Sequence, residues 1–308
     1  MGQDFYFYLP MNSKTLLHDS QLESSELIIT PRGAIYHLNL RPEEIADTII
    51  VVGDQNRVKR VSQHFDKIEH QLENREFVTH TGILNGKRLT VMSTGIGCDN
   101  IDIVVNELDA LVNIDLETRL IKPEQRKLNI IRLGTSGSLQ EDIDVDTFVI
   151  SSHGLGFDGL MNFYDVDYSQ EELDIKNAFI DQMNWSSSLN PPYVVEASNS
   201  LVNLLEPGMT KGITATAHGF YGPQGRALRL SPKQVGLNES LMNFNFNGHR
   251  ITNFEMETSA LYGLSGSLGH DACTVCAIIA NRFKKEYSKD YKVTVDLLIS
   301  NLLEKLVD

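Results

Sequence analysis

Short runs of apolar, mostly β-branched residues recur along this 308-residue chain, with amphipathic stretches between them. Continuous apolar runs are typical of strands that are buried on both faces, and the amphipathic stretches are typical of covering helices. The pattern therefore predicts an α/β fold with a central, largely buried sheet. The predicted strands cover residues 48–52, 77–84, 89–94, 129–133, 147–151, 213–217, 251–255 and 272–280.

Turn and helix signals fit the same fold. Asn85-Gly86 favours the two positive φ values of a type I′ turn, so it predicts a hairpin between the second and third strands. One predicted helix begins near Asn56, and three others cover residues 101–111, 260–268 and 293–306.

We expect a single domain over residues 35–308, preceded by an N-terminal leader at residues 1–34. Residues 113–127 are charged, contain Pro123 and separate a helix from a strand by more than the usual short connection. This segment is therefore interpreted as a surface insertion.

The formal net charge of −14 bears on the partners of the chain. A strongly acidic protein repels polyanions, which argues against nucleic acid or an anionic membrane as a partner. No apolar run is long enough for a membrane span, and the N-terminus does not resemble a signal peptide. We therefore expect a cytoplasmic protein, in which an anionic substrate needs a local group of arginines.

The three cysteines exclude a disulfide framework. Cys273 and Cys276 have the spacing of a redox pair, but they lie in an apolar, β-branched run that reads as a buried strand. Residues three apart in a strand point to opposite faces, so these thiols are expected to be packed in the core. The nine histidines show no metal-ligand spacing, and no metal site is expected.

Two turns carry residues suited to a phosphate. Gly53 and Arg57 follow the first strand, where a helix N-terminus offers unsatisfied N–H groups. Arg132 lies at the end of the strand at 129–133 and Thr135 follows it, and Arg75 precedes a strand. Three guanidinium groups around one dianion would overcome the unfavourable global charge through bidentate hydrogen bonds.

A second group of residues suits a sugar. Met256 and Glu257 lie where the strand at 251–255 ends. A carboxylate can accept hydrogen bonds from both hydroxyls of a ribose cis-diol, and a methionine can pack on the furanose. The alternative for Glu257 is an acid that stabilises the start of the following helix.

The loop at residues 220–226 suits a pyrimidine base. The carboxamide of Gln224 offers a donor and an acceptor that match the O2 and N3–H edge of uracil, and Arg226 can reach the remaining O4. Phe220 can cover the face of the ring. The alternative is a polar surface turn.

Seven segments in this order resemble the nucleoside phosphorylase I family, with the greatest similarity to its uridine phosphorylases. The resemblance covers roughly residues 35–305, and the segments are 53–57, 75–77, 93–97, 132–137, 220–226, 255–257 and 279–282. It implies a three-layer α/β/α nucleoside phosphorylase-like fold with a central mixed, twisted sheet. The Gln-x-Arg loop and the lack of an acid at residues 278–281 point to pyrimidine rather than purine nucleosides.

The resemblance also implies a role for each site residue. The phosphate-binding residues would be Gly53, Arg57, Arg132, Thr135 and, from a neighbouring subunit, Arg75. The ribose-binding residues would be Met256, Glu257 and the neighbour's His37. The base-binding residues would be Gly137, Phe220, Gln224 and Arg226.

The implied reaction is the phosphorolysis of uridine, or of related pyrimidine nucleosides, to the free base and (deoxy)ribose 1-phosphate in nucleoside salvage. Arg132, Gln224, Arg226 and Glu257 would be catalytic. Inorganic phosphate would be the co-substrate, with no organic cofactor and no metal. The protein would be a homo-oligomer, at least a dimer, with a hexamer as the larger alternative.

Two departures from the family pattern keep other functions open. Residues 98–102 replace the usual Gly-Pro-Ser/Thr type of sequence and introduce Asp99 and Asp102 near the expected phosphate end. His218-Gly219 replaces the usual polar residues before the base loop. The alternatives are a purine or broad-specificity phosphorylase, a nucleoside hydrolase and a noncatalytic nucleoside-binding protein.

Overall fold

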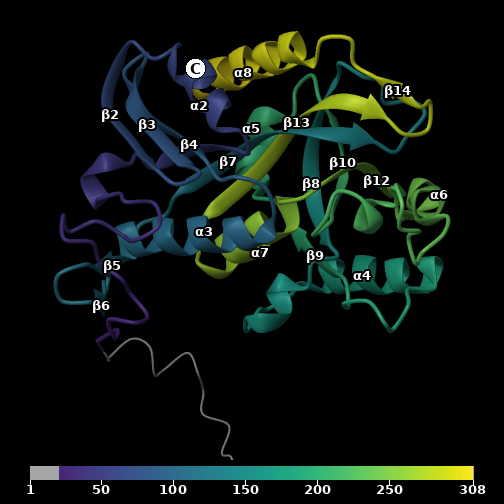
Figure 1. The fold of residues 1–308 in the computed structure, drawn as a ribbon, viewed down its shortest axis with the longest axis horizontal. Coiled ribbons are helices and arrows are strands. Elements are labelled where there is room, and N and C mark those ends of the chain that lie inside the picture. Colours follow the sequence, from purple (N-terminus) through teal and green to yellow (C-terminus); the bar gives the residue numbers. More distant parts are fainter. Residues whose placement is uncertain (1–20, 308) are drawn as a thin grey trace, which may run out of the picture.

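The computed structural model describes residues 21–307, which form a large mixed sheet, covered by helices, and a small separate hairpin (Figure 1). The strands are β1 (Thr48–Val52), β2 (Lys67–Asn74), β3 (Phe77–Leu84), β4 (Lys87–Ser93), β5 (Ile114–Asp115), β6 (Leu120–Ile121), β7 (Asn129–Ser138), β8 (Phe148–Gly156), β9 (Tyr193–Glu196), β10 (Thr210–Thr216), β11 (Asn245–Phe246), β12 (His249–Glu255), β13 (Asp271–Asn281) and β14 (Glu286–Tyr287). The α-helices are α2 (Gln55–Ser62), α3 (Cys98–Asn113), α4 (Gln170–Met183), α5 (Asn199–Leu205), α6 (Leu237–Asn243), α7 (Thr258–Ser267) and α8 (Tyr291–Val307). Three 3-10 turns are η1 (Pro42–Glu44), η2 (Leu160–Phe163) and η3 (Gly222–Gln224).

The large sheet has the strand order β11-β12-β10-β8-β13-β7-β1-β4-β3-β2. The pairs of β1 with β4 and β7, of β7 with β13, and of β10 with β8 and β12 are parallel, whereas β13 with β8 and the β2-β3-β4 strands are antiparallel. The predicted mixed sheet is confirmed.

One additional pairing closes part of this sheet on itself. The ends of β12 and β7 pair antiparallel, with Asn253 opposite Ser138 and Phe254 opposite Gly137. The strands β7, β13, β8, β10 and β12 thus form a closed ring. Because of this closure, residues at the ends of β7, β12 and β13 face one common space.

Helices cover both sides of the sheet, as expected for three layers. In Figure 1, α3, α4 and α7 lie below the sheet and α2 and α8 lie above it. Four of the five residues of β1 are buried, and α7 is buried along most of its length. An apolar strand that is covered on both faces explains why its sequence shows no alternation.

Every predicted strand is present, but the predicted ends of β7 and β8 are wrong. The strand expected at residues 147–151 continues to Gly156. A loop was expected after residue 133, yet the strand continues to Ser138, with Gly134 opposite Cys276 and Thr135 opposite Ala277. The glycines and hydroxyl residues that look like a turn are held in the sheet by pairing with β13. Tertiary pairing overrides the local preference here.

The predicted type I′ hairpin is confirmed. Asn85 and Gly86 have φ values of 48° and 77° between the antiparallel β3 and β4. Cys273 and Cys276 are buried free thiols in β13, as the strand interpretation required.

Residues 1–20 of the predicted leader lie outside the described part of the chain. Within the predicted insertion, β5 and β6 pair as a small separate hairpin after α3. Its Arg119 carbonyl accepts a hydrogen bond from the Leu22 amide at 3.0 Å. Among residues 21–307 there is no helix that is both long and apolar enough to cross a membrane.

Candidate active site

A cavity of about 600 Å³ lies where β7, β12 and β13 end, beside the turn after β1 and the η3 loop. Ten of the twelve predicted site residues line it. They are Gly53, Arg57, Arg132, Thr135, Gly137, Phe220, Gln224, Arg226, Met256 and Glu257. The structure thus brings together segments that are up to about two hundred residues apart in the sequence, while His37 and Arg75 lie elsewhere.

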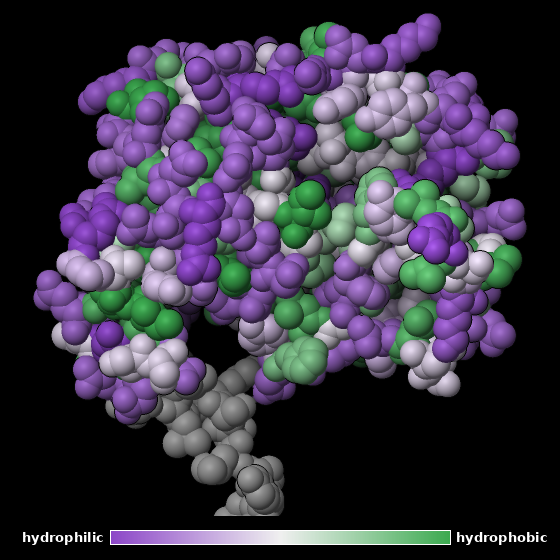
Figure 2. Space-filling view, in the orientation of Figure 1, coloured by the Kyte–Doolittle hydropathy of each residue, from purple (hydrophilic) through white to green (hydrophobic). Residues whose placement is uncertain are grey.

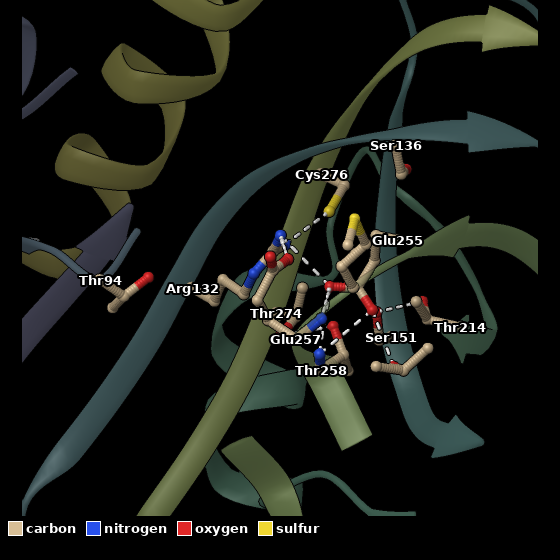
Figure 3. A network of polar contacts seen from close by, with 12 residues as sticks. Thr94, Arg132, Ser136, Ser151, Thr214, Glu255, Glu257, Thr258, Thr274 and Cys276 are labelled. Carbon is tan, nitrogen blue, oxygen red and sulfur yellow. Dashed lines mark hydrogen bonds and ion pairs between the residues drawn. The ribbon is translucent and has the colours of Figure 1, made fainter. Parts of the chain in front are cut away.

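At the floor of the cavity, Arg132 is paired with two carboxylates (Figure 3). Its Nη2 contacts Glu257 Oε2 and lies 3.2 Å from Glu255 Oε2. All three side chains are buried. Burial alone would lower the pKa of Arg132, but the carboxylates of Glu257 and Glu255 raise it above its ordinary value. The guanidinium is therefore a fixed positive charge.

Glu255 is held by hydrogen bonds from several directions. Its carboxylate accepts bonds from the backbone amides of Glu257 at 3.0 Å and Thr258 at 3.1 Å, and from Thr216 Oγ1 at 2.8 Å. Burial raises the pKa of Glu255, and Arg132 opposes that effect. The carboxylate caps the start of α7 while it balances the charge of Arg132.

Glu257 is held on its other side by the turn before α3. The backbone amide of Gly97 donates to Glu257 Oε1 at 2.8 Å, and Gly97 has φ 102°, a conformation that favours glycine. A carboxylate offers about four lone-pair sites. Glu257 can therefore keep Arg132 and Gly97 and still accept hydrogen bonds from a ligand.

Gly134 makes room for the Arg132 guanidinium. A Cβ at this position would collide with the guanidinium and lie 2.9 Å from Cys276 Sγ. The thiol itself lies 3.3 Å from Arg132 Nη1. Burial raises the pKa of Cys276 to about 11, so this neighbour is a neutral thiol at physiological pH.

Arg57 adds a second buried cation on the wall of the cavity. Its Nη1 donates to the Leu133 carbonyl at 3.1 Å, and its Nε has no partner among the described residues. Burial lowers the pKa of Arg57, and the nearby Arg132 lowers it further. An anion bound between the two guanidinium groups would raise the pKa of Arg57 again, because it would stabilise the charged form.

The start of α2 offers less to an anion than the sequence indicated. Asp54 is the N-cap residue and accepts a hydrogen bond from the Asn56 amide at 3.0 Å. Asp54 also lines the cavity. Anion binding at this turn would therefore depend on Arg57 more than on free backbone donors.

The other end of the cavity is built around the buried amide of Gln224. Its Oε1 accepts hydrogen bonds from Arg226 Nη1 at 2.5 Å and from Arg282 Nη2 at 2.7 Å, and Arg282 Nη1 donates to its backbone carbonyl at 2.6 Å. Its Nε2 has only a 3.5 Å contact with the Glu255 carbonyl. The amide donors are thus nearly free, whereas the acceptor is occupied by two guanidinium groups.

The guanidinium of Arg226 covers the ring of Phe220 in this structure. The Cζ of Arg226 lies 3.7 Å from the centre of the Phe220 ring, and Arg226 Nη1 donates to the Phe220 carbonyl at 2.7 Å. This is cation–π geometry. A base that stacked on Phe220 would therefore have to displace Arg226.

His37 and Arg75 belong to a separate group of residues, which we call the Tyr36–Arg75 patch (Tyr36, His37, Asn74 and Arg75). Asn74 Nδ2 donates to the His37 carbonyl at 2.7 Å, and Arg75 Nη2 lies 3.3 Å from the Tyr36 hydroxyl. His37 Nδ1 lies 2.6 Å from Glu107 Oε1. None of the four lines this chain's cavity.

Asp99 and Asp102, in the segment 98–102 that differs from the family pattern, also lie outside the cavity lining. Asp102 accepts hydrogen bonds from the Tyr164 hydroxyl and, at 3.2 Å, from Asn106 Nδ2. Burial and Asp102 raise the pKa of Tyr164 to about 12. The structure therefore directs Asp102 into a local contact of α3, and neither it nor Asp99 forms a wall at the phosphate end.

The site roles of two residues, Glu255 and Arg282, were not predicted from the sequence. Glu255 precedes Glu257 by two positions, and in an extended strand this spacing places both side chains on one face, where one arginine can meet them. Arg282 directly follows β13, but nothing in the sequence shows that it folds back onto Gln224. Among residues 21–307 no group of three or more His, Cys, Asp or Glu side chains is arranged to hold a metal.

Comparison with known proteins identifies the fold family. Residues 47–305 match the Phosphorylase superfamily. The chain belongs to this superfamily. A uridine phosphorylase of Thermococcus kodakarensis is 30% identical over 293 residues, which cover 92% of this chain and 91% of that protein. A uridine phosphorylase of Haemophilus influenzae is 28% identical over 82% of this chain and 89% of its own length.

A solved structure agrees with this assignment. The chain is similar to a Trypanosoma brucei nucleoside phosphorylase that is described as showing uridine phosphorylase activity, with a TM-score of 0.82 and 30% identity. The match covers 91% of this chain and 99% of the trypanosomal one. The phosphorylase superfamily fold predicted from the sequence is confirmed.

In this phosphorylase, we predict that Glu255→Ala lowers the free energy of unfolding by about 3 to 5 kcal/mol, because it leaves a buried arginine with one partner fewer. The matched control is Asp142→Ala, which breaks the exposed 2.8 Å ion pair with Arg250 and should cost about 0 to 1 kcal/mol. Urea denaturation of both variants measures the difference. Equal losses would show that the buried pair contributes nothing special.

Proposed function

We propose that this chain catalyses the phosphorolysis of uridine, or of a related pyrimidine nucleoside, to the free base and a pentose 1-phosphate. One observation carries the proposal. A single cavity is lined by two buried arginines, by a carboxylate beside a methionine, and by an amide beside a guanidinium. These are complementary to a phosphate, a ribose and a uracil, the three groups that this reaction brings together.

The phosphate would bind between Arg57 and Arg132. Both are buried, one has an unpartnered donor, and the Thr135 hydroxyl lines the same cavity. Arg132 is already balanced by Glu255 and Glu257, so Arg57 supplies the unbalanced positive charge. Charge-assisted hydrogen bonds from two guanidinium groups would orient the phosphate for attack.

The ribose would lie against Met256, with its hydroxyls on Glu257. Contacts to Arg132 and Gly97 fix the Glu257 carboxylate, so its remaining lone pairs point in set directions. A preorganised acceptor of this kind holds the anomeric carbon in place relative to the phosphate.

The uracil would bind at Gln224. Its amide N–H can donate to O2, and its Oε1 can accept from N3–H once a guanidinium leaves that oxygen. Arg226 is the group that would leave, because its other contacts are with Phe220 of the same loop, whereas Arg282 is also bonded to the Gln224 backbone carbonyl. The freed Arg226 would then donate to O4.

In the reaction, the bond between C1′ and the base nitrogen breaks, and its electron pair remains on the uracil. Negative charge spreads to the carbonyl oxygens, where Gln224 and Arg226 stabilise it as hydrogen-bond donors. A phosphate oxygen attacks C1′ from the opposite face as positive charge develops on the sugar. The uracil anion takes up a proton from solvent, and the products are uracil and α-ribose 1-phosphate. The mechanism requires phosphate as co-substrate and no organic cofactor or metal.

We propose further that two copies of the chain share each site. His37 and Arg75 lie together in the Tyr36–Arg75 patch and away from their own cavity, as expected if both serve the cavity of a partner. The protein would then be at least a dimer, with a hexamer as the larger alternative. Cytoplasmic nucleoside salvage is the role that we propose for it.

We predict that uracil release from uridine requires phosphate and that Arg57→Ala lowers kcat/KM for phosphate by about 10- to 100-fold, since a charged hydrogen bond contributes about 1.5 to 3 kcal/mol. Arg60→Ala is the matched control, because Arg60 lies on the same helix but pairs with Asp296. It should stay within about twofold of wild type. Uracil release that is equally fast without phosphate would indicate a hydrolase.

Base choice should depend on Gln224. Sites that pair with polar edges discriminate by up to about 10⁴-fold against ligands that leave those groups unpaired. Uridine should therefore be far preferred over cytidine and inosine, and Gln224→Ala should reduce this preference. The measurement is kcat/KM for the three nucleosides in phosphate buffer. Comparable or better rates on inosine would indicate a purine or broad-specificity enzyme.

Shared sites can be tested by subunit exchange. Arg75→Ala and Glu257→Ala should each be nearly inactive, but a mixed dimer would contain one site without either substitution. Mixing the two variants under conditions that allow exchange should restore part of the activity. A fully active monomer, or no recovery in a verified mixed dimer, would contradict the shared site.

A further inference from the structure

A second and larger cavity lies on the other side of the base loop. Its volume is about 770 Å³, which is within the range of small-molecule sites. We call it the loop cavity. It is lined by parts of the segments 185–190 and 218–237, together with Phe157.

The floor of the loop cavity is apolar and aromatic. Phe157 and Trp185 stack with their ring centres 4.9 Å apart, and Leu189 and Leu237 line the cavity beside them. The indole N–H donates to the Asn190 carbonyl at 3.0 Å, so Trp185 is fixed in place. A rigid aromatic floor favours a flat apolar ligand.

The charges around this cavity have one sign. The arginine and lysine side chains that line it are Arg226, Arg229 and Lys233, and the lining contains no Asp or Glu. This is unusual in a chain with a net charge of −14. Arg229 makes no hydrogen bond or ion pair within residues 21–307, and Lys233 has only Ser188 Oγ at 2.8 Å. Clefts lined by one sign of charge attract ligands of the opposite sign.

The segment 218–237 also exposes apolar side chains next to these cations. Leu228 and Leu230 are 78% and 87% exposed on either side of Arg229. Figure 2 shows hydrophobic residues gathered among strongly hydrophilic ones on the right of the molecule, in the region of α6. A ligand in the cavity would cover both kinds of surface at once.

We propose that the loop cavity binds a small aromatic anion, that is, a flat apolar ring system with one carboxylate or sulfonate group. The rings would lie on Phe157 and Trp185, and the anion would be held by Arg229 and Lys233. Arg226 lines both cavities, so an occupant of the loop cavity would also act on the group that is proposed to contact uracil.

The experiment uses a matched pair of probes with the full-length protein. 8-Anilinonaphthalene-1-sulfonate carries the aromatic rings and a sulfonate, and N-phenyl-1-naphthylamine has the same rings without the charge. Fluorescence titration should show one sulfonate probe per chain, bound at least about tenfold more tightly than the neutral probe, as expected for charge-assisted contacts. Equal affinities would overturn the proposal.

Variants locate the bound probe. Arg229→Ala/Lys233→Ala should weaken the sulfonate probe about tenfold or more and leave the neutral probe within about twofold. Lys67→Ala/Lys87→Ala makes the same change in net charge on β2 and β4 and should have little effect on either probe. Loss of binding in this control, or loss only in Arg57→Ala, would place the probe elsewhere and refute the proposal.

A second measurement tests the coupling through Arg226, and this part alone rests on the proposed function. The sulfonate probe should inhibit uracil release and raise the dissociation constant for uridine, and uridine should weaken probe binding by the same factor, because binding couplings are reciprocal. Arg229→Ala/Lys233→Ala should abolish the inhibition while uracil release without the probe stays within about twofold. Probe binding without any phosphorolysis would contradict the proposed function and still support the loop cavity.

Discussion

The buried pairing of Arg132 with Glu255 and Glu257 is the interaction on which the candidate site depends. A guanidinium in the middle of a central strand is unfavourable unless carboxylates accompany it. Here Glu255 ends β12 and Glu257 lies just before α7. The same carboxylates reach the start of α7 and the turn before α3. One charge cluster thus fixes the relative positions of three segments that carry site residues. Its geometry is set before any ligand enters, which is the requirement for electrostatic catalysis.

The closed ring of strands explains why this cluster can form. The pairing of β12 with β7 brings Phe254 opposite Gly137, so the strand that carries Glu255 ends beside the strand that carries Arg132. A flat, open sheet of the same strands would leave these two ends far apart. The cavity and the ion cluster therefore depend on this one strand pairing. The lining of the loop cavity and that of the candidate active site have one residue in common, Arg226.

Much of this arrangement could be predicted from the sequence because its signals are local. Apolar runs without alternation predicted the buried strands, and Asn85-Gly86 predicted the hairpin, since each depends on the covalent geometry of a few residues. The end of β7 was wrong because residues 134–138 are held by β13, which no local preference encodes. Glu255 and Arg282 were missed for a related reason. Their roles come from contacts with Arg132 and Gln224, which only the folded chain brings near. His37 and Arg75 were expected in a partner's site, and both lie outside the cavity of their own chain.

The measurement that tests the central claim most directly is the identity of the sugar product. The account holds that Arg57 and Arg132 orient a phosphate for attack on C1′, so the phosphate must end on the sugar. Following ³¹P NMR of the protein with uridine and inorganic phosphate should show one equivalent of α-ribose 1-phosphate for every uracil released, with an equal loss of inorganic phosphate. Release of uracil with free ribose and an unchanged phosphate signal would contradict it.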